Sequence, residues 1–186
     1  MTRFSLLGAL TLVLGACSSP GWPEFGAVGA TASLINGSGI KIGEANFAER
    51  RDGGVDMELT AWDLPPGIYG MHIHDSGFCD NPDFQTAGGH FNPFGRKHGL
   101  KNPQGPHAGD LPNLVVPPDG RVSMVVTLRE VTLREGVNSL LRREGTSLVI
   151  HANPDDQTTD PAGNSGARMA CGVIQGAPTG GEIEAR

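Results

Sequence analysis

The sequence predicts an all-β domain, a sandwich or barrel of short strands joined by long loops. Apolar and polar residues alternate with a period of two along several short segments, which is typical of half-buried strands. The chain contains 28 glycines and 14 prolines, and this density of turn-forming residues argues against a helical bundle or a coiled coil. Its 186 residues fit a single domain.

Two segments, residues 55–61 and 122–128, show the alternation most clearly. In the first, Val, Met, Leu and Ala occupy every second position and Asp, Glu and Thr lie between them, so one face is expected to be buried. Short apolar runs predict interior strands at residues 148–150 and 172–174. Weaker patterns predict two further strands, at residues 27–35 and 39–47.

The long stretches at residues 75–114 and 152–167 are rich in Gly, Pro, Asn and Asp and lack hydrophobic periodicity. Loops of this length in a compact domain usually serve a function, so we expect the functional residues here. Residues 137–144 are the segment in which we expect one or two turns of helix.

The first 16 residues have the features of a secretory signal: Arg3 provides the positive start, and residues 6–14 form a short apolar core. The next motif, Leu14-Gly15-Ala16-Cys17, resembles the bacterial lipobox, in which cleavage before the cysteine accompanies attachment of lipid to its sulfur. We therefore expect Cys17 to be lipidated. The alternative is an ordinary small-residue cleavage site with an incidental cysteine.

This interpretation divides the chain into a signal peptide (1–16), a lipid-modified tether (17–29), a folded domain (30–176) and a C-terminal tail (177–186). Removing the signal peptide takes away one basic and no acidic residue, which changes the formal net charge from −6 to −7. A chain with this negative charge is a poor nucleic-acid binder. No apolar run reaches the ~18–20 residues that a transmembrane helix needs. We expect a domain anchored by lipid to a bacterial membrane outside the cytoplasm, in the periplasm or cell envelope.

The remaining two cysteines, Cys79 and Cys171, form an even pair in a compartment where disulfides persist. We expect a bridge between them. It would close about 92 residues, which the chain-entropy description values at roughly 4–5 kcal/mol. The alternative is two free buried thiols.

Histidine supplies the strongest chemical signal in the sequence. Met71 and Ile73 alternate with His72 and His74, so a strand here would bury its apolar side chains and present both imidazoles on the other face, about 6–7 Å apart. That spacing allows the two rings to share one metal ion.

A second group of candidate ligands, His90, His98, His107 and Asp110, lies within 21 residues of one loop. Three imidazoles and one carboxylate form a tetrahedral set of the kind that Zn²⁺ accepts. With His151 the chain has six histidines in all, and their alternative role is as scattered, solvated side chains.

Five motifs resemble, in the same order, the successive signatures of the copper/zinc superoxide dismutase family. They are Gly70-Met71-His72-Ile73-His74, Gly88-Gly89-His90-Phe91-Asn92-Pro93, His107-Ala108-Gly109-Asp110-Leu111-Pro112, Val149-Ile150-His151-Ala152-Asn153 and the segment from Gly163 to Ile174. A cysteine five residues after His74 is similar to the family's bacterial branch. The resemblance implies an eight-stranded Greek-key β-barrel with two long functional loops, and an antioxidant activity that converts two superoxide anions to dioxygen and hydrogen peroxide.

The resemblance also implies one copper and one zinc ion per chain. Copper would be held by His72, His74, His90 and His151, and zinc by His90, His98, His107 and Asp110. Copper must change oxidation state, so it suits imidazole ligands that leave one side of the ion open. Zinc does not change oxidation state and takes a closed set of four ligands. The shared His90 would bridge the ions as an imidazolate, tuned by zinc, and return a proton to the forming peroxide.

Two more residues match the family pattern. Asp155 matches a carboxylate that links a copper histidine to a zinc histidine, with a solvent-facing loop Asp as the alternative. Arg168 matches the arginine that guides the superoxide anion, with a surface Arg as the alternative. The loop at residues 155–168 contains no Lys or Glu, so the family's usual guidance charges are absent there. Basic residues of the other loop could replace them: Arg96, Lys97 and Lys101.

Two other functions remain as alternatives. A copper-only dismutase would lack the zinc ligands, and a non-enzymatic protein that buffers copper or zinc would need no anion guide. The expected partners are the superoxide anion and, through Cys17, a membrane. The oligomeric state stays open, with a homodimer as one expectation.

Overall fold

Strands provide nearly all the regular structure in the computed structural model, which describes residues 29–177. The elements are β1 (Gly29–Asn36), β2 (Lys41–Glu49), β3 (Val55–Ala61), β4 (Gly67–Tyr69), β5 (Met71–His74), the 3₁₀ helix η1 (Gln85–Ala87), β6 (Leu114–Val116), β7 (Val122–Leu128), β8 (Ser147–His151), β9 (Arg168–Val173) and β10 (Gln175–Gly176).

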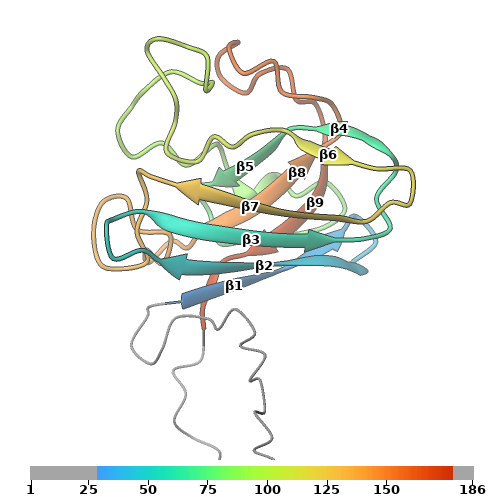
Figure 1. Cartoon of the computed structure of the whole chain (residues 1–186), viewed down its shortest axis with the longest axis horizontal. Helices are drawn as coiled ribbons and strands as arrows, with labels where there is room; N and C mark the ends of the chain where they lie inside the picture. The colour runs from blue at the N-terminus through green and yellow to red at the C-terminus, as the bar shows by residue number, and fades with distance from the viewer. Residues whose placement is uncertain (1–28, 178–186) are drawn as a thin grey trace, which may run out of the picture.

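The strands form an eight-stranded antiparallel sheet in the order β5-β8-β9-β1-β2-β3-β7, with β10 added on β1. The sheet curls, so that β1, β2, β3 and β7 lie in front of β5, β8 and β9 (Figure 1). A separate pair, β4 and β6, connects its two edges, since β4 leads into β5 and β6 precedes β7. The predicted all-β, eight-stranded barrel architecture is confirmed.

The hydrophobic periodicity predicted the strands correctly because the apolar positions are the ones whose side chains are buried. In β3, every second side chain, from Val55 to Ala61, is at most 1% exposed. Met57 and Leu59 pair with Val126 and Met124 of β7 across the sheet. Burying one such side chain contributes about 1.5–3 kcal/mol, so the interior of the barrel stabilises these strands. The weaker predictions at residues 27–35 and 39–47 correspond to β1 and β2.

The expectation of helical turns at residues 137–144 was wrong, because this segment forms non-helical turns. A helix would direct the Leu140 N–H to the carbonyl of Gly136, but it donates instead to Thr132 O at 2.8 Å. Thr132 and Ser139 form an isolated bridge. This pairing buries Leu140 completely, so tertiary packing outweighs local helix propensity.

The loop after β5 folds back over the free edge of that strand. The Ile73 N–H donates to Gly109 O, and the Phe91 N–H donates to Ile73 O, both at 2.8 Å. A β-carbon at position 109 would collide with the carbonyl oxygen of Ile73, so the close approach requires glycine there. These backbone bonds place residues 90 and 110 directly beside the histidines of β5.

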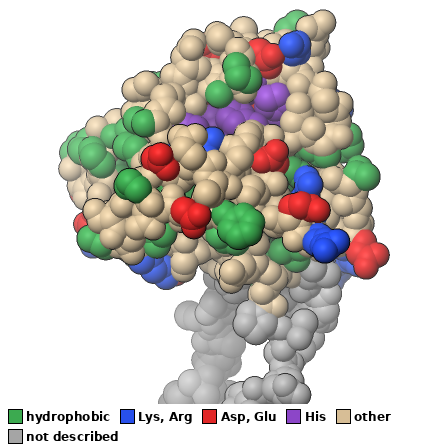
Figure 2. All heavy atoms as spheres, turned by 180° about the vertical axis from the view of Figure 1, so that it is seen from behind, with side chains coloured by type: hydrophobic (Ala, Val, Ile, Leu, Met, Phe, Trp, Pro, Cys, Tyr) green, Lys and Arg blue, Asp and Glu red, His purple; other side chains and the backbone are tan. Residues whose placement is uncertain are grey.

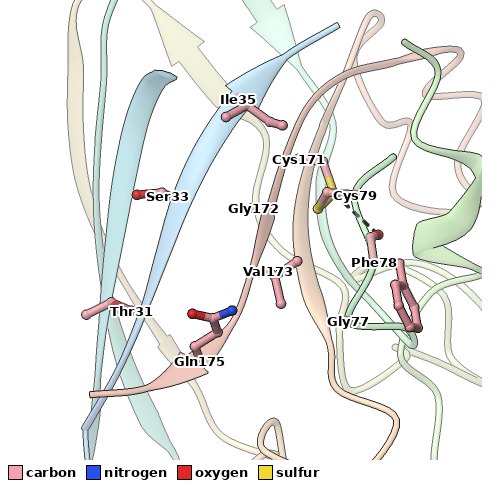
Figure 3. Close-up of a pocket in the computed structure, with 10 residues that line it drawn as sticks. All are labelled: Thr31, Ser33, Ile35, Gly77, Phe78, Cys79, Cys171, Gly172, Val173 and Gln175. Atoms are coloured by element: carbon pink, nitrogen blue, oxygen red, sulfur yellow. Dashed lines mark hydrogen bonds between the residues drawn. A yellow bond between two sulfur atoms is a disulfide. The ribbon is translucent and has the colours of Figure 1, made fainter. Parts of the chain in front are cut away.

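A disulfide between Cys79 and Cys171 ties the same loop to β9, as expected from the sequence. Cys171 is fully buried, and the bridge lies at one side of a groove of about 410 Å³ between β1, β9 and Gly77–Cys79 (Figure 3). The loop that carries His90 is therefore covalently attached to the strand that carries Arg168.

Within residues 29–177, no helix is long and apolar enough to cross a membrane. The predicted signal peptide, Cys17 and nearly all of the predicted tether and tail lie outside the described residues.

Replacing Cys79 and Cys171 together with alanine should lower the free energy of unfolding by about 2–5 kcal/mol, because the bridge spans a sequence separation of 92 residues. Urea denaturation of the metal-free proteins measures this loss. The matched control is the wild-type protein unfolded with and without reductant, which should reproduce the difference. A decrease in the free energy of unfolding of less than about 1 kcal/mol in both comparisons would contradict the stabilising role of the disulfide.

Candidate metal centre

The six histidines converge at one place on the outside of the barrel, beneath the two long loops. Figure 2 shows histidine side chains gathered in a hollow of the surface. The ring centroids of His72 and His90 lie 3.9 Å apart, and those of His98 and His107 lie 5.5 Å apart. The rings of His72 and His74 are separated by 6.3 Å, in the range that the alternation predicted. The predicted constellation is confirmed, and the alternative of scattered histidines is excluded.

Four of these side chains form the copper set: His72, His74, His90 and His151, whose ligand atoms all lie within 4.8 Å of one another. The Nε2 atoms of His74 and His151 are 3.3 Å apart. Their Nδ1–H groups donate to backbone carbonyls, of Gly88 at 3.0 Å and Gly166 at 3.2 Å. Because a carbonyl only accepts, each Nε2 keeps its lone pair for a metal ion.

The zinc set surrounds one oxygen of Asp110. Its Oδ1 lies 3.1, 3.0 and 3.3 Å from the Nδ1 atoms of His90, His98 and His107. Tetrahedral zinc with bonds of about 2.0–2.1 Å would separate neighbouring ligand atoms by roughly 3.3 Å, so these distances suit the ion. The other oxygen of Asp110 accepts the Gly99 and His107 N–H groups, which hold the carboxylate in place.

Several ligand nitrogens are buried without a hydrogen-bond partner: His72 Nδ1, His90 Nε2 and His107 Nδ1. Buried polar atoms are rarely left unsatisfied, because each one loses its hydration without compensation. Coordination would satisfy all three. The residues present therefore fit one copper and one zinc ion, with His90 facing the zinc set through Nδ1 and the copper set through Nε2.

His72 also lies within ligand distance of His90, His98 and Asp110. Its Nε2, however, bonds to Asp155 Oδ2 at 2.7 Å, which leaves Nδ1 for copper. His107, whose Nδ1 faces Asp110, completes the zinc set.

Asp155 joins the two halves of the centre. Its Oδ2 contacts His72 of the copper set, and its Oδ1 lies 3.0 Å from Nε2 of His98 in the zinc set. Position 163 must be glycine for this contact, because a β-carbon there would overlap the Asp155 carboxylate and its φ is +59°. The structure thus brings Asp155 to the place that the family resemblance implied.

Burial and the neighbouring carboxylates set the protonation of the metal-free site. Burial lowers the pKa of His90 to about 4 and that of His151 to about 3, so both are neutral at pH 7, the form that binds metal. Burial acts in the same direction on His98, but the hydrogen bonds that its ring donates to Asp110 and Asp155 outweigh burial and raise the pKa of His98 to about 9. The same network holds the pKa of Asp110 below its usual range, although burial opposes this.

Arg168, at the start of β9, lines a cavity of about 420 Å³ together with His74, His90 and His151. Its guanidinium donates to the carbonyl oxygens of Phe84 and Gly88, the latter at 2.6 Å. Burial lowers the pKa of Arg168, while the nearby carboxylates of Asp83 and Asp75 oppose the shift. Arginine nevertheless stays protonated.

The three basic residues proposed from the other loop are placed differently. Arg96 pairs with Glu130 at 2.6 Å, and Lys97 pairs with Asp160 at 2.9 Å. Lys101 is exposed and does not line the cavity. Sequence reasoning missed Asp160, which is 63 residues from Lys97 and belongs to no motif that would single it out.

The profile of the copper/zinc superoxide dismutase family matches residues 41–174. The chain belongs to this family. It is 51% identical to superoxide dismutase [Cu-Zn] 1 of Aquifex aeolicus over 146 residues, which cover 77% of this chain and 86% of that protein. It is also 42% identical to a superoxide dismutase-like protein of Bacillus subtilis over 155 residues, covering 82% of this chain and 79% of that one.

A solved structure of a superoxide dismutase-like protein from Bacillus subtilis superposes with a TM-score of 0.77 at 41% identity, covering 80% of this chain and all of that one. The relatives and the two ligand sets together show a copper/zinc superoxide dismutase, which converts two superoxide anions to dioxygen and hydrogen peroxide. The zinc ligands are all present, which disfavours the copper-only alternative, and the match to dismutases disfavours the metal buffer.

Zinc uptake by the metal-free protein should release about one proton per ion at pH 7. The charged form of His98, whose pKa is raised to about 9, must lose its proton before Nδ1 can bind zinc. Because protons compete with the metal below pH 9, zinc affinity should rise roughly tenfold per pH unit between pH 7 and 8. Isothermal titration in two buffers of different ionisation enthalpy measures the proton count. Zinc binding without net proton release would contradict the charged state of His98.

Proposed function

We propose that this dismutase captures superoxide with Arg168, delivers a proton through His90, and works as a lipid-anchored protein outside the cytoplasm. The observation that carries the catalytic part is the cavity, in which Arg168 lies with His74, His90 and His151. Among residues 29–177, Arg168 is the only lysine or arginine that lines this cavity. A small anion that enters therefore meets a positive charge beside the copper ligands.

Arg168 is prepared for this task by its hydrogen bonds. Two of its N–H groups donate to the carbonyls of Phe84 and Gly88, which fix the plane of the guanidinium. An arginine side chain has five N–H donors, so others remain to bind a superoxide oxygen. Its partial burial makes the interaction with an anion stronger than it would be in bulk water.

Copper, when bound, supplies the one-electron redox chemistry that oxidises one superoxide anion and reduces the next. Formation of hydrogen peroxide takes up two protons: in this proposal His90 delivers one, solvent delivers the other, and the chain supplies the geometry. His90 Nε2 faces the copper set and has no protein partner, so this nitrogen can hold a proton and pass it to the forming peroxide. His90 Nδ1 remains directed at the zinc set, which keeps the ring in position during proton transfer.

Asp155 has a positioning role in this proposal. By accepting from His72 and His98 it fixes which ring nitrogen of each faces the metals. A change at Asp155 would therefore affect both metals, although its own oxygens belong to neither ligand set.

The proposed location rests on two observations that are independent of each other. Cys17 follows a signal-like segment in a lipobox-like motif, and Cys79 and Cys171 form a disulfide, which is typical of oxidising compartments. We infer that residues 1–16 are removed, that residues 17–29 tether the folded domain to a membrane, and that residues 177–186 form a tail.

Arg168→Ala should reduce the rate of superoxide consumption roughly tenfold or more at low ionic strength, and Arg168→Glu should reduce it further by reversing the charge. Added salt should slow the wild type more than Arg168→Ala, because salt screens the attraction that the variant lacks. Pulse radiolysis measures these rates, and metal analysis should find copper and zinc unchanged. Arg51→Ala, which removes the same charge from an exposed turn, is the matched control. Wild-type rates in both Arg168 variants would exclude Arg168 as the guide.

Cys17→Ser should move the protein out of the membrane fraction or block removal of the signal peptide, because serine offers no sulfur for the lipid. Fractionation of a bacterial host and mass spectrometry of the N-terminus test this. Ser18→Ala is the control and should remain in the membrane. Membrane retention of Cys17→Ser with a processed N-terminus would reject the lipid anchor.

A further inference from the structure

Of the described residues that line the cavity above the metal centre, one is acidic: Asp160, whose charge is opposite in sign to that of Arg168. Asp160 belongs to the loop between β8 and β9. Figure 2 shows further acidic side chains around the hollow that contains the histidines. The described chain thus offers a small anion a mixed electrostatic environment, and the charge on Asp160 opposes its approach.

Asp160 is held by two contacts, both to the other loop. Its Oδ1 accepts the backbone N–H of His98 at 2.9 Å, and its Oδ2 accepts from Lys97 Nζ at 2.9 Å. The Lys97 and Asp160 side chains are 56% and 39% exposed, so solvent reaches both partners. Asp160 lines the cavity, and Lys97 contacts it from outside the lining. Arg96, the neighbour of Lys97, is directed to Glu130 and cannot offset Asp160 in this arrangement.

We propose that the Lys97–Asp160 pair sets how readily anions reach the metal centre: Asp160 repels them, and Lys97 offsets most of that repulsion. This inference rests on the proposed capture of superoxide by Arg168. Asp160 and Lys97 act on the approach of the anion and do not touch the reacting atoms.

The two charges have opposite and testable effects. Loss of Asp160 removes a negative charge from the cavity wall and leaves the ammonium of Lys97 without its partner, so anions should be attracted more strongly. Loss of Lys97 exposes the charge of Asp160, so anions should be repelled. Interactions of single exposed charges change association by small factors and are screened within about 8 Å at physiological salt. We therefore expect changes of roughly two- to fivefold at low ionic strength, and smaller changes at high ionic strength.

Asp160→Asn is the informative variant, because an asparagine oxygen can still accept the His98 N–H and so preserve the backbone of the zinc loop. Lys97→Met is its counterpart, and the double variant removes both charges together. Lys101→Met is the matched control, since Lys101 is an exposed lysine of the same loop, whereas the lysine paired with the cavity residue Asp160 is Lys97.

Azide, a small monovalent anion, serves as the probe. Its dissociation constant is measured by spectroscopic titration of the copper- and zinc-loaded protein, and superoxide consumption is measured on the same samples. Asp160→Asn should bind azide more tightly and react faster, Lys97→Met should do the opposite, and the double variant should return close to wild type. Lys101→Met should change little.

Unchanged azide affinity in both single variants would overturn the inference, as would an equal effect of Lys101→Met, which would indicate overall charge alone. Loss of zinc from Asp160→Asn together with weaker azide binding would also overturn it, because Asp160 would then act only by holding His98. If wild-type protein failed to consume superoxide, the proposed function would fall, while the azide titrations would still test the charge pair.

Discussion

The metal centre depends on the buried carboxylate of Asp155, which connects three segments of the chain. Asp155 comes from the loop between β8 and β9, His72 from β5 and His98 from the loop after β5, and the two carboxylate oxygens contact one histidine each. An ionised carboxylate is costly to bury unless it is hydrogen-bonded, so Asp155 stabilises the closed arrangement only when both loops are in place. The requirement for glycine at position 163 shows how tightly the second loop packs on this contact.

The loop after β5 is secured to the barrel at three places by different forces. Backbone hydrogen bonds attach it to the free edge of β5, the disulfide attaches Cys79 to β9, and Arg168 of β9 donates to its carbonyl oxygens. Gly88 takes part twice, since its carbonyl accepts from both His74 and Arg168. A ligand of the copper set and Arg168, the proposed anion-binding residue, are therefore positioned by the same piece of backbone.

The positive charge of Arg168 in the cavity is opposite in sign to the net charge of the whole chain. The chain carries a formal net charge of −6, yet its substrate is an anion. Superoxide dismutase is itself a known example of electrostatic steering, in which local positive potential near the metal speeds association. Here the described cavity lining contains a single arginine, and two of the three basic residues considered as substitutes for the usual guidance charges are paired with Glu130 and Asp160. The electrostatic field that an anion meets therefore depends more on which basic residues form ion pairs than on how many basic residues there are.

The sequence by itself determined the all-β class, most strands and the candidate metal ligands, because strand periodicity, histidine spacing and short motifs are local signals. The division of these ligands into a copper set and a zinc set came from the resemblance of those motifs to a family. It failed at residues 137–144, where pairing with Thr132 replaced the expected helical turns. Only the tertiary structure decided which ring nitrogen of each histidine faces a metal, and which basic residues are free to meet an anion. Those features depend on contacts such as His72–Asp155 and Lys97–Asp160, between residues 83 and 63 positions apart. Such contacts form only when the barrel brings its two loops together, so no local pattern records them.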